Sequence, residues 1–276
     1  MPLTANLAAH GALDATEPEL GCFLPWESIY RTRPRPALTC RDCEGPMHAK
    51  ISSRGLRFFA HDRRSPYCAS AGETEEHRIL KRDLAQAARE AGCRAELEVT
   101  AAHGGWRADV LVTAPHGRRT ALEAQVSSAS VDDILDRTRR YQDGDNVDVL
   151  WFTHRSARWL DHVPSAHLYR PARPQDPWVR THERVSRFSV VSCAEICDPR
   201  PAWHNDYHTS WIASAELSLG EFVAGVLHGR LVPRTQPGVG GLLFQGWTTP
   251  RDVQAEAKYQ AEVAKPKPSP PPPPPW

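Results

Sequence analysis

The chain has 276 residues, 40% of them hydrophobic and 24% charged, a balance typical of a globular protein with one sizeable core and smaller accessory units. The net charge of +1 excludes a protein that attracts nucleic acid through one global basic field. Charge is nevertheless uneven, because residues 31–68 carry nine Lys or Arg and only three acids. This segment can contact phosphate groups, or it can be an ordinary solvated basic surface.

We expect no signal peptide, because the first twenty residues include Asp14, Glu17 and Glu19 and lack a basic start followed by an apolar run. No stretch approaches the ~20 apolar residues that a membrane-spanning helix needs. The seven cysteines are an odd number and are not laid out as a disulfide framework. We therefore expect a cytoplasmic, reducing location and no membrane partner.

Composition divides the chain into five segments. Residues 1–36 are weakly patterned, and we expect a weakly structured segment there. Residues 37–71 contain the Cys and His residues of a small candidate zinc-binding module, and residues 72–169 form the main domain. Residues 170–262 form a C-terminal region of unknown fold that is partly helical. Residues 263–276 are proline-rich, so we expect a disordered tail that can also dock on a protein partner.

Hydrophobic periodicity predicts an α/β fold for the main domain. Leu80, Leu84 and Ala88 lie four residues apart on one helix face, and Gly92 is placed to end that helix. Ser130 is placed to cap a second helix. The predicted order is a helix at 73–92, strands at 94–101, 106–114 and 119–127, a helix at 131–142 and a strand at 147–152. A further helix is predicted at 217–231.

Four residues of the second segment have the spacing of zinc ligands. Cys40, Cys43, His61 and Cys68 follow the pattern C-x2-C-x17-H-x6-C. Zinc favours four such ligands in a tetrahedron, and the ion can organise a segment too short to fold by burial alone. His48 is an alternative to His61, and unligated thiols in a loop are the alternative to a metal site.

Two carboxylates are predicted to face each other across a hairpin of the main domain. A three-residue loop that ends at Gly117 pairs residue 114 with residue 118, and counting back places Asp109 opposite Glu123. Glu123 and Gln125 share a face of their strand. In this register the two acids stand ~5 Å apart at Cβ, whereas a two-residue loop would place them on opposite faces.

Two acids so close repel each other unless a positive charge lies between them. A Mg²⁺ ion suits such oxygen ligands, and it can activate water and stabilise charge on a phosphodiester oxygen. Asp109 and Glu123 are therefore candidate Mg²⁺ ligands. The alternative is two ordinary exposed acids on a half-solvated sheet.

The first predicted helix carries polar residues on its otherwise apolar face. Glu73 and His77 share the angular sector of Leu80, and Lys81 lies at the edge of that sector. Because burying such groups without partners is costly, we expect them to face a site rather than a dry core. A cluster of i,i+4 neighbours on the helix surface is the alternative.

Several of these motifs together resemble the competence protein CoiA family. The resemblance rests on the following segments, in order: Phe58–His61, Cys68, Glu73–Lys81, Arg107–Asp109, Glu123–Ser127, Arg137, Tyr141 and Trp151. It implies a PD-(D/E)XK nuclease core, which is a restriction-endonuclease-like αβββαβ unit with a mixed central sheet flanked by helices. It also implies Asp109 and Glu123 as Mg²⁺ ligands, and a role in the uptake, processing or recombination of DNA.

One position departs from the family pattern, because Gln125 stands where the motif has lysine. Glutamine can orient a water or a phosphate oxygen but brings no positive charge. We expect Lys81 to replace that charge, and Glu73 and His77 to assist. The leading hypothesis is a Mg²⁺-dependent deoxyribonuclease, with a DNA-binding accessory protein that has lost catalysis as the alternative. A scaffold that recruits a partner through the proline-rich tail is a third, and the oligomeric state is open.

The C-terminal region contains two pairs of potential ligands. Cys193 and Cys197 are four residues apart, as are His204 and His208. From the residues alone, ordinary thiols are favoured for the first pair, and no third ligand is evident for the second.

Overall fold

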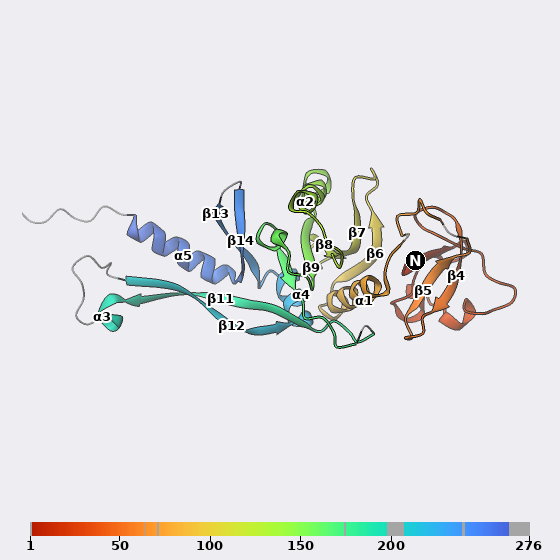
Figure 1. Cartoon of the computed structure of the whole chain (residues 1–276), viewed down its shortest axis with the longest axis horizontal. Coiled ribbons are helices and arrows are strands. Elements are labelled where there is room, and N and C mark those ends of the chain that lie inside the picture. The colour runs from red at the N-terminus through yellow and green to blue at the C-terminus, as the bar shows by residue number, and fades with distance from the viewer. Residues whose placement is uncertain are drawn as a thin grey trace, which may run out of the picture.

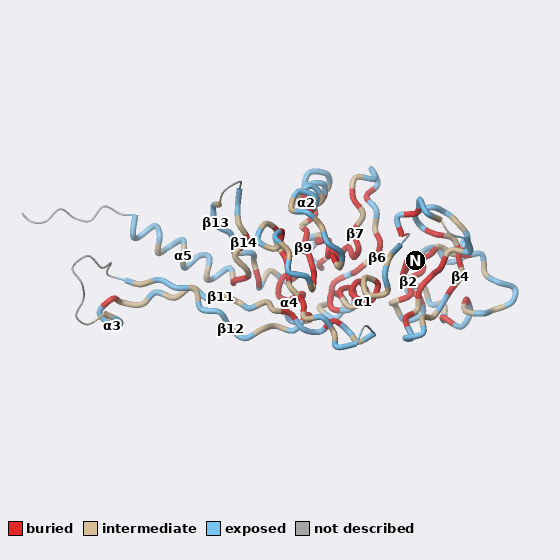
Figure 2. The backbone as a smooth tube through the Cα atoms, viewed as in Figure 1, coloured by how far each residue is buried: buried red, intermediate tan, exposed pale blue. Residues whose placement is uncertain are grey.

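The computed structural model describes residues 2–63, 65–70, 72–173, 175–197, 207–238 and 241–264. Three sheets follow one another along the longest axis of the molecule (Figure 1). Buried residues concentrate in the N-terminal and central parts, whereas the C-terminal hairpin is largely exposed or half-buried (Figure 2). Among the described residues, no helix is both long and apolar enough to cross a membrane.

The N-terminal sheet corrects the expectation for residues 1–36. Its order is β2-β1-β3-β4-β5, so the first two strands belong to the same sheet as the Cys and His residues. Leu13, Leu20 and Trp26 lie in one buried cluster with Phe59, which explains why the early residues are ordered. The strands are β1 (Thr4–Leu7), β2 (Gly11–Asp14), β3 (Leu38–Thr39), β4 (Pro46–Ile51) and β5 (Arg57–His61), and two short 3-10 helices, η1 (Pro18–Gly21) and η2 (Trp26–Ser28), lie between β2 and β3.

The central sheet has the order β10-β9-β8-β7-β6. Strands β6, β7 and β8 are antiparallel neighbours, whereas β8, β9 and β10 run parallel. The predicted helices and strands of this part are present, with ends within about three residues of those expected. They are α1 (Glu75–Glu90), β6 (Arg94–Thr100), β7 (Arg107–Thr113), β8 (Arg119–Ala124), α2 (Val131–Asp145), β9 (Asp148–Thr153), η3 (Arg158–Asp161) and β10 (Ser165–His167).

Both helices of the central part begin at side-chain caps. The hydroxyl of Thr74 accepts from the backbone N–H of His77, and that of Ser130 accepts from Asp133. Helix α1 ends before Gly92, which has φ of 75°. Helix α1 packs its apolar face on β6, β7 and β8 in one hydrophobic cluster, and α2 packs on β9 in another. The polar residues of both helices therefore reach the same sheet.

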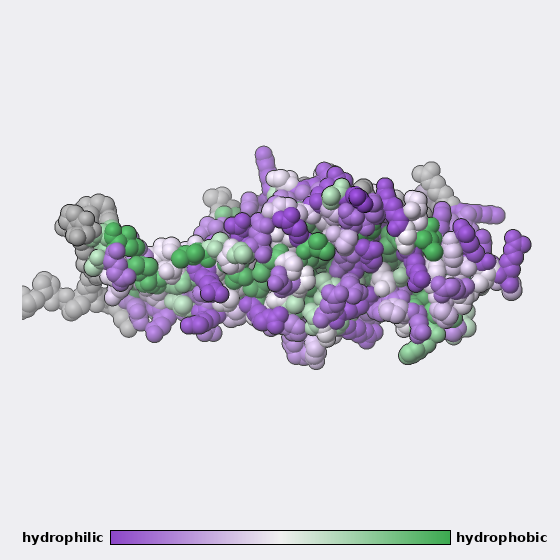
Figure 3. Space-filling view, turned by 90° about the horizontal axis from the view of Figure 1, so that it is seen from below, coloured by the Kyte–Doolittle hydropathy of each residue, from purple (hydrophilic) through white to green (hydrophobic). Residues whose placement is uncertain are grey.

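The C-terminal region is mainly a four-stranded sheet of order β12-β11-β14-β13. Strands β11 and β12 form a long hairpin that extends away from the central sheet (Figure 1). Hydrophilic side chains cover much of the face shown in Figure 3, and hydrophobic ones form separate patches along its length, including one at the end that carries the hairpin. The elements are β11 (Arg180–Ser192), α3 (Cys193–Ile196), β12 (Tyr207–Ser218), α4 (Leu219–Leu227), β13 (Val232–Gly238), β14 (Gly241–Thr248) and α5 (Pro250–Val263).

The expected helix at 217–231 is α4, which packs against α1 and buries Phe222 against Phe152 and Trp247. The region is partly helical, as expected, but it also contains four strands, which together hold more residues than its helices. Residue 263, where the expected tail begins, is the last of α5. Residues 265–276 of the proline-rich tail lie outside the described residues, as does His204.

Candidate active site and metal centre

The predicted register of the β7–β8 hairpin is confirmed. Val110 pairs with Leu122, and the backbone N–H of Ala114 donates to the carbonyl of Arg118 at 2.9 Å. Gly117 has φ of 88°, the left-handed conformation that this turn requires. Asp109 and Glu123 therefore lie side by side on one face of the sheet.

The two carboxylates are also linked through backbone groups. The N–H of Asp109 donates to Oε1 of Glu123 at 3.2 Å, and the N–H of Ala124 donates to Oδ2 of Asp109 at 3.0 Å. Both side chains are buried, with Asp109 8% and Glu123 1% exposed. They are therefore not the exposed acids of a half-solvated sheet.

Helix α2 supplies the remaining contacts of Glu123. The hydroxyl of Tyr141 donates to Oε1 at 2.6 Å, and Nη2 of Arg137 donates to Oε2 at 2.8 Å. Burial and the neighbouring charge of Asp109 nevertheless raise the pKa of Glu123 to about 7, because Arg137 offsets only part of both effects. The site thus holds two carboxylates whose mutual repulsion is incompletely neutralised.

Helix α1 supplies a different environment to Asp109. Nε2 of His77 lies 3.0 Å from Oδ2 of Asp109, and Nδ1 lies 3.2 Å from Glu73. Burial lowers the pKa of His77, but the charges of Asp109 and Glu73 outweigh it and raise that pKa to about 9. Burial raises the pKa of Asp109, yet His77 and Lys81 hold it well below its usual range. At neutral pH the imidazolium and the Asp109 carboxylate thus form an ion pair.

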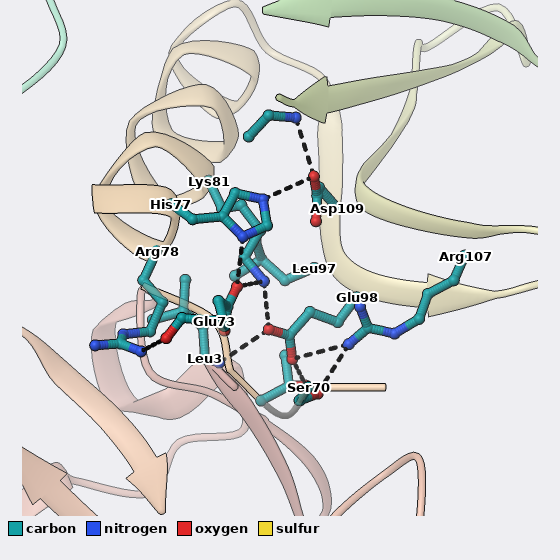
Figure 4. A network of polar contacts seen from close by, with 12 residues as sticks. Leu3, Ser70, Glu73, His77, Arg78, Lys81, Leu97, Glu98, Arg107 and Asp109 are labelled. Carbon is teal, nitrogen blue, oxygen red and sulfur yellow. Dashed lines mark hydrogen bonds and ion pairs between the residues drawn. The ribbon is translucent and has the colours of Figure 1, made fainter. Parts of the chain in front are cut away.

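Lys81 lies at the centre of a buried charge network that joins α1 to the N-terminal sheet (Figure 4). Its ammonium group pairs with Glu73 and lies 2.6 Å from Oε1 of Glu98. The other oxygen of Glu98 accepts from the hydroxyl of Thr4 at 2.6 Å. Burial raises the pKa of Glu98, but Lys81 and Arg107 outweigh it and lower that pKa to about 2. These ion pairs, rather than the surroundings of Gln125, determine where the charge of Lys81 lies.

Glu98 also has an unusual backbone. Its φ of 56° is left-handed, a conformation that a non-glycine residue adopts at an energetic cost. The network around the carboxylate, which also accepts from the N–H of Leu3 at 3.1 Å, compensates this cost. The strained residue therefore ties the central sheet to the N-terminal one.

Gln125 contacts a cation that does not come from α1. Its amide donates to Oγ of Ser127 at 2.9 Å, and its oxygen accepts from Nη1 of Arg137 at 2.9 Å. The Arg137 guanidinium also lies over the ring of Trp151, 4.5 Å from the centroid. Arg137 thus bridges Glu123 and Gln125, a role that the sequence analysis did not assign to it. Its i,i+4 spacing from Tyr141 was the available signal, since both residues reach Glu123.

A pocket of about 410 Å³ lies at the carboxyl ends of the parallel strands β8 and β9, and Asp109, Glu123, Gln125 and Arg137 are not among its lining residues. It is lined by residues 127–131 and by 153 with 155–159. Ser127 lies both in this lining and against Gln125, and the exposed residues Arg155 and Arg158 supply positive charge. This edge of a parallel sheet is where α/β proteins commonly bind ligands.

The four predicted zinc ligands come together at the N-terminal sheet. Their ligand atoms all lie within 4.8 Å of one another. The sulfurs of Cys40 and Cys68 are 3.6 Å apart, and that of Cys43 lies 3.3 Å from Nε2 of His61. His48, the alternative ligand, instead lies 2.7 Å from Asp62. Three soft sulfur donors and one imidazole at this spacing can hold a zinc ion.

One part of the chain matches a known protein family. Residues 73–161 match the family described as competence protein CoiA, nuclease-like domain. The match confirms the resemblance seen in the sequence for this segment and includes Asp109, Glu123, Gln125 and Arg137. No curated protein and no solved structure matches the chain significantly.

Proposed function

Because residues 73–161 form a nuclease-like domain of the CoiA type, we propose that the protein is a metal-dependent nuclease that cleaves DNA phosphodiester bonds at Asp109 and Glu123. The observation that carries the proposal is the pairing of two buried carboxylates on one sheet face, one of them in contact with the partly exposed Arg137. A pocket with basic residues adjoins Gln125 through Ser127. The helices and mixed sheet around it suit a restriction-endonuclease-like core. We place its action in DNA uptake, processing or recombination, in the cytoplasm.

The donor set fits a magnesium ion. Hard carboxylate oxygens are the ligands that Mg²⁺ prefers. The raised pKa of Glu123 reflects burial and a neighbouring negative charge, and a divalent cation would relieve both. Asp109 and Glu123 would hold the ion, which when bound supplies charge for the scissile phosphate and acidifies a water molecule.

Arg137 is the residue best placed to supply the charge that the motif lysine would bring. Its guanidinium fork already contacts both Glu123 and Gln125, and the side chain is 34% exposed. Such a group can donate two parallel hydrogen bonds to a phosphate. The contacts therefore favour Arg137 over Lys81 for this role, and we assign to Gln125 the positioning of a water or phosphate oxygen.

The residues of α1 would hold the other side of the site in position. The His77 imidazolium fixes Oδ2 of Asp109, and Glu73 orients the imidazolium from its other nitrogen. Lys81 forms ion pairs with both Glu73 and Glu98. Each of these buried charges therefore has an opposite charge beside it, which fixes the side chains in place. We assign positioning roles to Glu73, His77 and Lys81.

The N-terminal sheet with its zinc site would bind the DNA backbone. Its contacts would be with phosphates, which give affinity without sequence preference. The exposed basic residues of this part are Arg31, Arg33, Arg35, Arg41, Lys50, Arg54 and Arg63. Zinc at the Cys and His cluster would hold this surface together.

One observation favours a second candidate function, a DNA-binding accessory protein without catalysis. Both oxygens of Glu123 already have protein donors in Arg137 and Tyr141. A cation must compete with these donors, and without it the centre would bind DNA but not cut it.

Metal dependence separates the two functions. Labelled single- and double-stranded DNA and RNA are incubated with the purified protein in Mg²⁺, Mn²⁺ or EDTA, and binding is measured in parallel at several salt concentrations. The proposed nuclease cuts DNA with a divalent ion and not with EDTA. Salt-sensitive binding without cleavage in any metal would instead establish the accessory protein.

A further inference from the structure

A second group of potential metal ligands lies at the tip of the β11–β12 hairpin, far from the carboxylate centre (Figure 1). It consists of Cys193, Cys197 and His208, whose ligand atoms lie within 4.8 Å of one another. The sulfur of Cys197 is 3.4 Å from Nε2 of His208. In the sequence the thiols and the histidine belong to two separate pairs, and the fold brings them together.

Local structure explains why these three converge. Cys193 and Cys197 bracket the single turn α3, in which the N–H of Cys197 donates to the carbonyl of Cys193 at 2.8 Å, so the two side chains lie on one face. The returning strand β12 places His208 opposite Val191, two residues before Cys193. The ligands thus come from both sides of the hairpin.

The burial of this tip differs from that of the hairpin around it. Cys193 is 0% exposed, whereas Ile196 and Tyr207 are 59% and 52% exposed. Figure 2 shows this buried stretch at α3 within an otherwise exposed or half-buried ribbon. Cys193 belongs to none of the three hydrophobic clusters that the described residues form. Because the tip of the β11–β12 hairpin buries so little apolar surface, another interaction must stabilise its structure. A bound metal ion can do so.

We propose that the hairpin tip binds a zinc ion through Cys193, Cys197 and His208. Two thiolates and an imidazole are the soft and borderline donors that zinc prefers over magnesium or calcium. The C-x3-C spacing lies within the range of known zinc sites. These three ligands leave one position of a tetrahedron for a further group or a water molecule. The ion would tie β11 to β12 at the end where their pairing stops.

The zinc content of the full chain is measured by elemental mass spectrometry. The variants are Cys193→Ser with Cys197→Ser, Cys40→Ser with Cys43→Ser, and Cys22→Ser, a half-buried thiol outside both clusters. We expect the first double variant to lose one equivalent of zinc relative to the parent, independently of the second. A zinc content equal to the parent's and to that of Cys22→Ser would overturn the proposal.

A second measurement uses the unmodified protein and does not require the variants to fold. The alkylation of each cysteine by iodoacetamide is followed by peptide mass spectrometry, before and after removal of zinc with a chelator. We expect Cys197 to react about tenfold faster without the metal, since a coordinated thiolate is protected, while Cys22 is unchanged. An unchanged rate for Cys197, or a Cys193–Cys197 disulfide in the parent, would contradict the site. Both readouts are independent of DNA cleavage.

Discussion

The two carboxylates of the central sheet stand opposite each other on neighbouring strands, yet their surroundings differ. Asp109 faces α1, whose His77 and Lys81 belong to a buried network of ion pairs. Glu123 faces α2, whose Arg137 is partly exposed and also contacts Gln125. The pKa of Asp109 is lowered, whereas that of Glu123 is raised.

This difference indicates that the two helices have different roles. On the α1 side each charge has an opposite charge beside it, so the network is fixed and contributes mainly position and stability. On the α2 side Arg137 contacts Glu123 and is partly exposed, and in the proposed function it would also contact a phosphate. Removal of a cation on the α1 side should therefore reduce stability, and removal of one on the α2 side should reduce activity.

The largest effect is expected at Arg137. We expect Arg137→Gln to lower kcat about 10²–10³-fold, the usual cost of removing one donor that stabilises developing charge. We expect a smaller loss of stability than at Lys81, because the Arg137 side chain is 34% exposed whereas that of Lys81 is 1% exposed. Arg139→Gln is the matched control, because Arg139 is an exposed arginine on the same helix that pairs with Asp136. Cleavage kinetics on labelled DNA provide the measurement. If Arg137→Gln cleaves as fast as the control, the charge comes from elsewhere.

The opposite pattern is expected at Lys81. Lys81→Met leaves Glu73 and Glu98 buried without their cation, so we expect the free energy of unfolding to fall by about 3 kcal/mol. At a temperature where the variant remains folded, kcat should stay within about tenfold of the parent. Denaturant unfolding and cleavage assays measure the two, with Lys50→Met, an exposed lysine of β4, as control. If Lys81→Met instead lost as much activity as Arg137→Gln without losing stability, Lys81 would supply the charge of the missing motif lysine.

The network around Lys81 should also stabilise the protein in a pH-dependent way. The pKa of Glu98 is lowered from 4.5 to about 2, mainly by Lys81. Its contribution is therefore fully present well above pH 4.5 and is lost as the pH falls toward 2, a loss of about 3 kcal/mol. In Glu98→Gln, the difference in unfolding free energy from the parent should shrink over this range. A difference that is constant with pH would show that the ion pair does not titrate as described.

Glu183 of β11 provides the reverse case, a half-buried carboxylate that has no ion pair among the described residues. Burial raises its pKa from 4.5 to about 7, and the N–H of His167 offsets only part of this. Its ionisation therefore lowers stability as the pH rises from 4.5 to 7. We expect Glu183→Gln to be more stable than the parent by about 1 kcal/mol above pH 7 and equal to it near pH 4.5. Denaturant unfolding as a function of pH measures this, and a variant less stable at every pH would be inconsistent with it.

Local signals in the sequence were sufficient for the central sheet and for the pairing of its acids. The hairpin register follows from Gly117, and two helix ends follow from Ser130 and Gly92, all of which act within a few residues. The zinc ligands Cys40 and Cys43 were likewise visible as a spacing. These features depend on neighbours in the chain, so they could be predicted.

The features that escaped prediction depend on tertiary packing. Arg137 bridges Glu123 and Gln125 only because α2 packs across β9, which no local pattern encodes. The strands of residues 1–36 are only four residues long and obtain their order from distant Phe59. Similarly, Cys197 and His208 meet only through the register of a long hairpin. The sequence alone could indicate which residues belong to these sites but not which of them are in contact.

The most direct test of the central claim compares Asp109→Asn with Asp148→Asn in the cleavage of labelled single- and double-stranded DNA with Mg²⁺ or EDTA. Asp148 is the matched control, an aspartate at the start of β9 whose partly exposed side chain pairs with Arg118. We predict Mg²⁺-dependent cleavage by the parent and the control, and none by Asp109→Asn with intact folding and DNA binding. Equal cleavage by Asp109→Asn and the control would contradict a nuclease centre at these carboxylates.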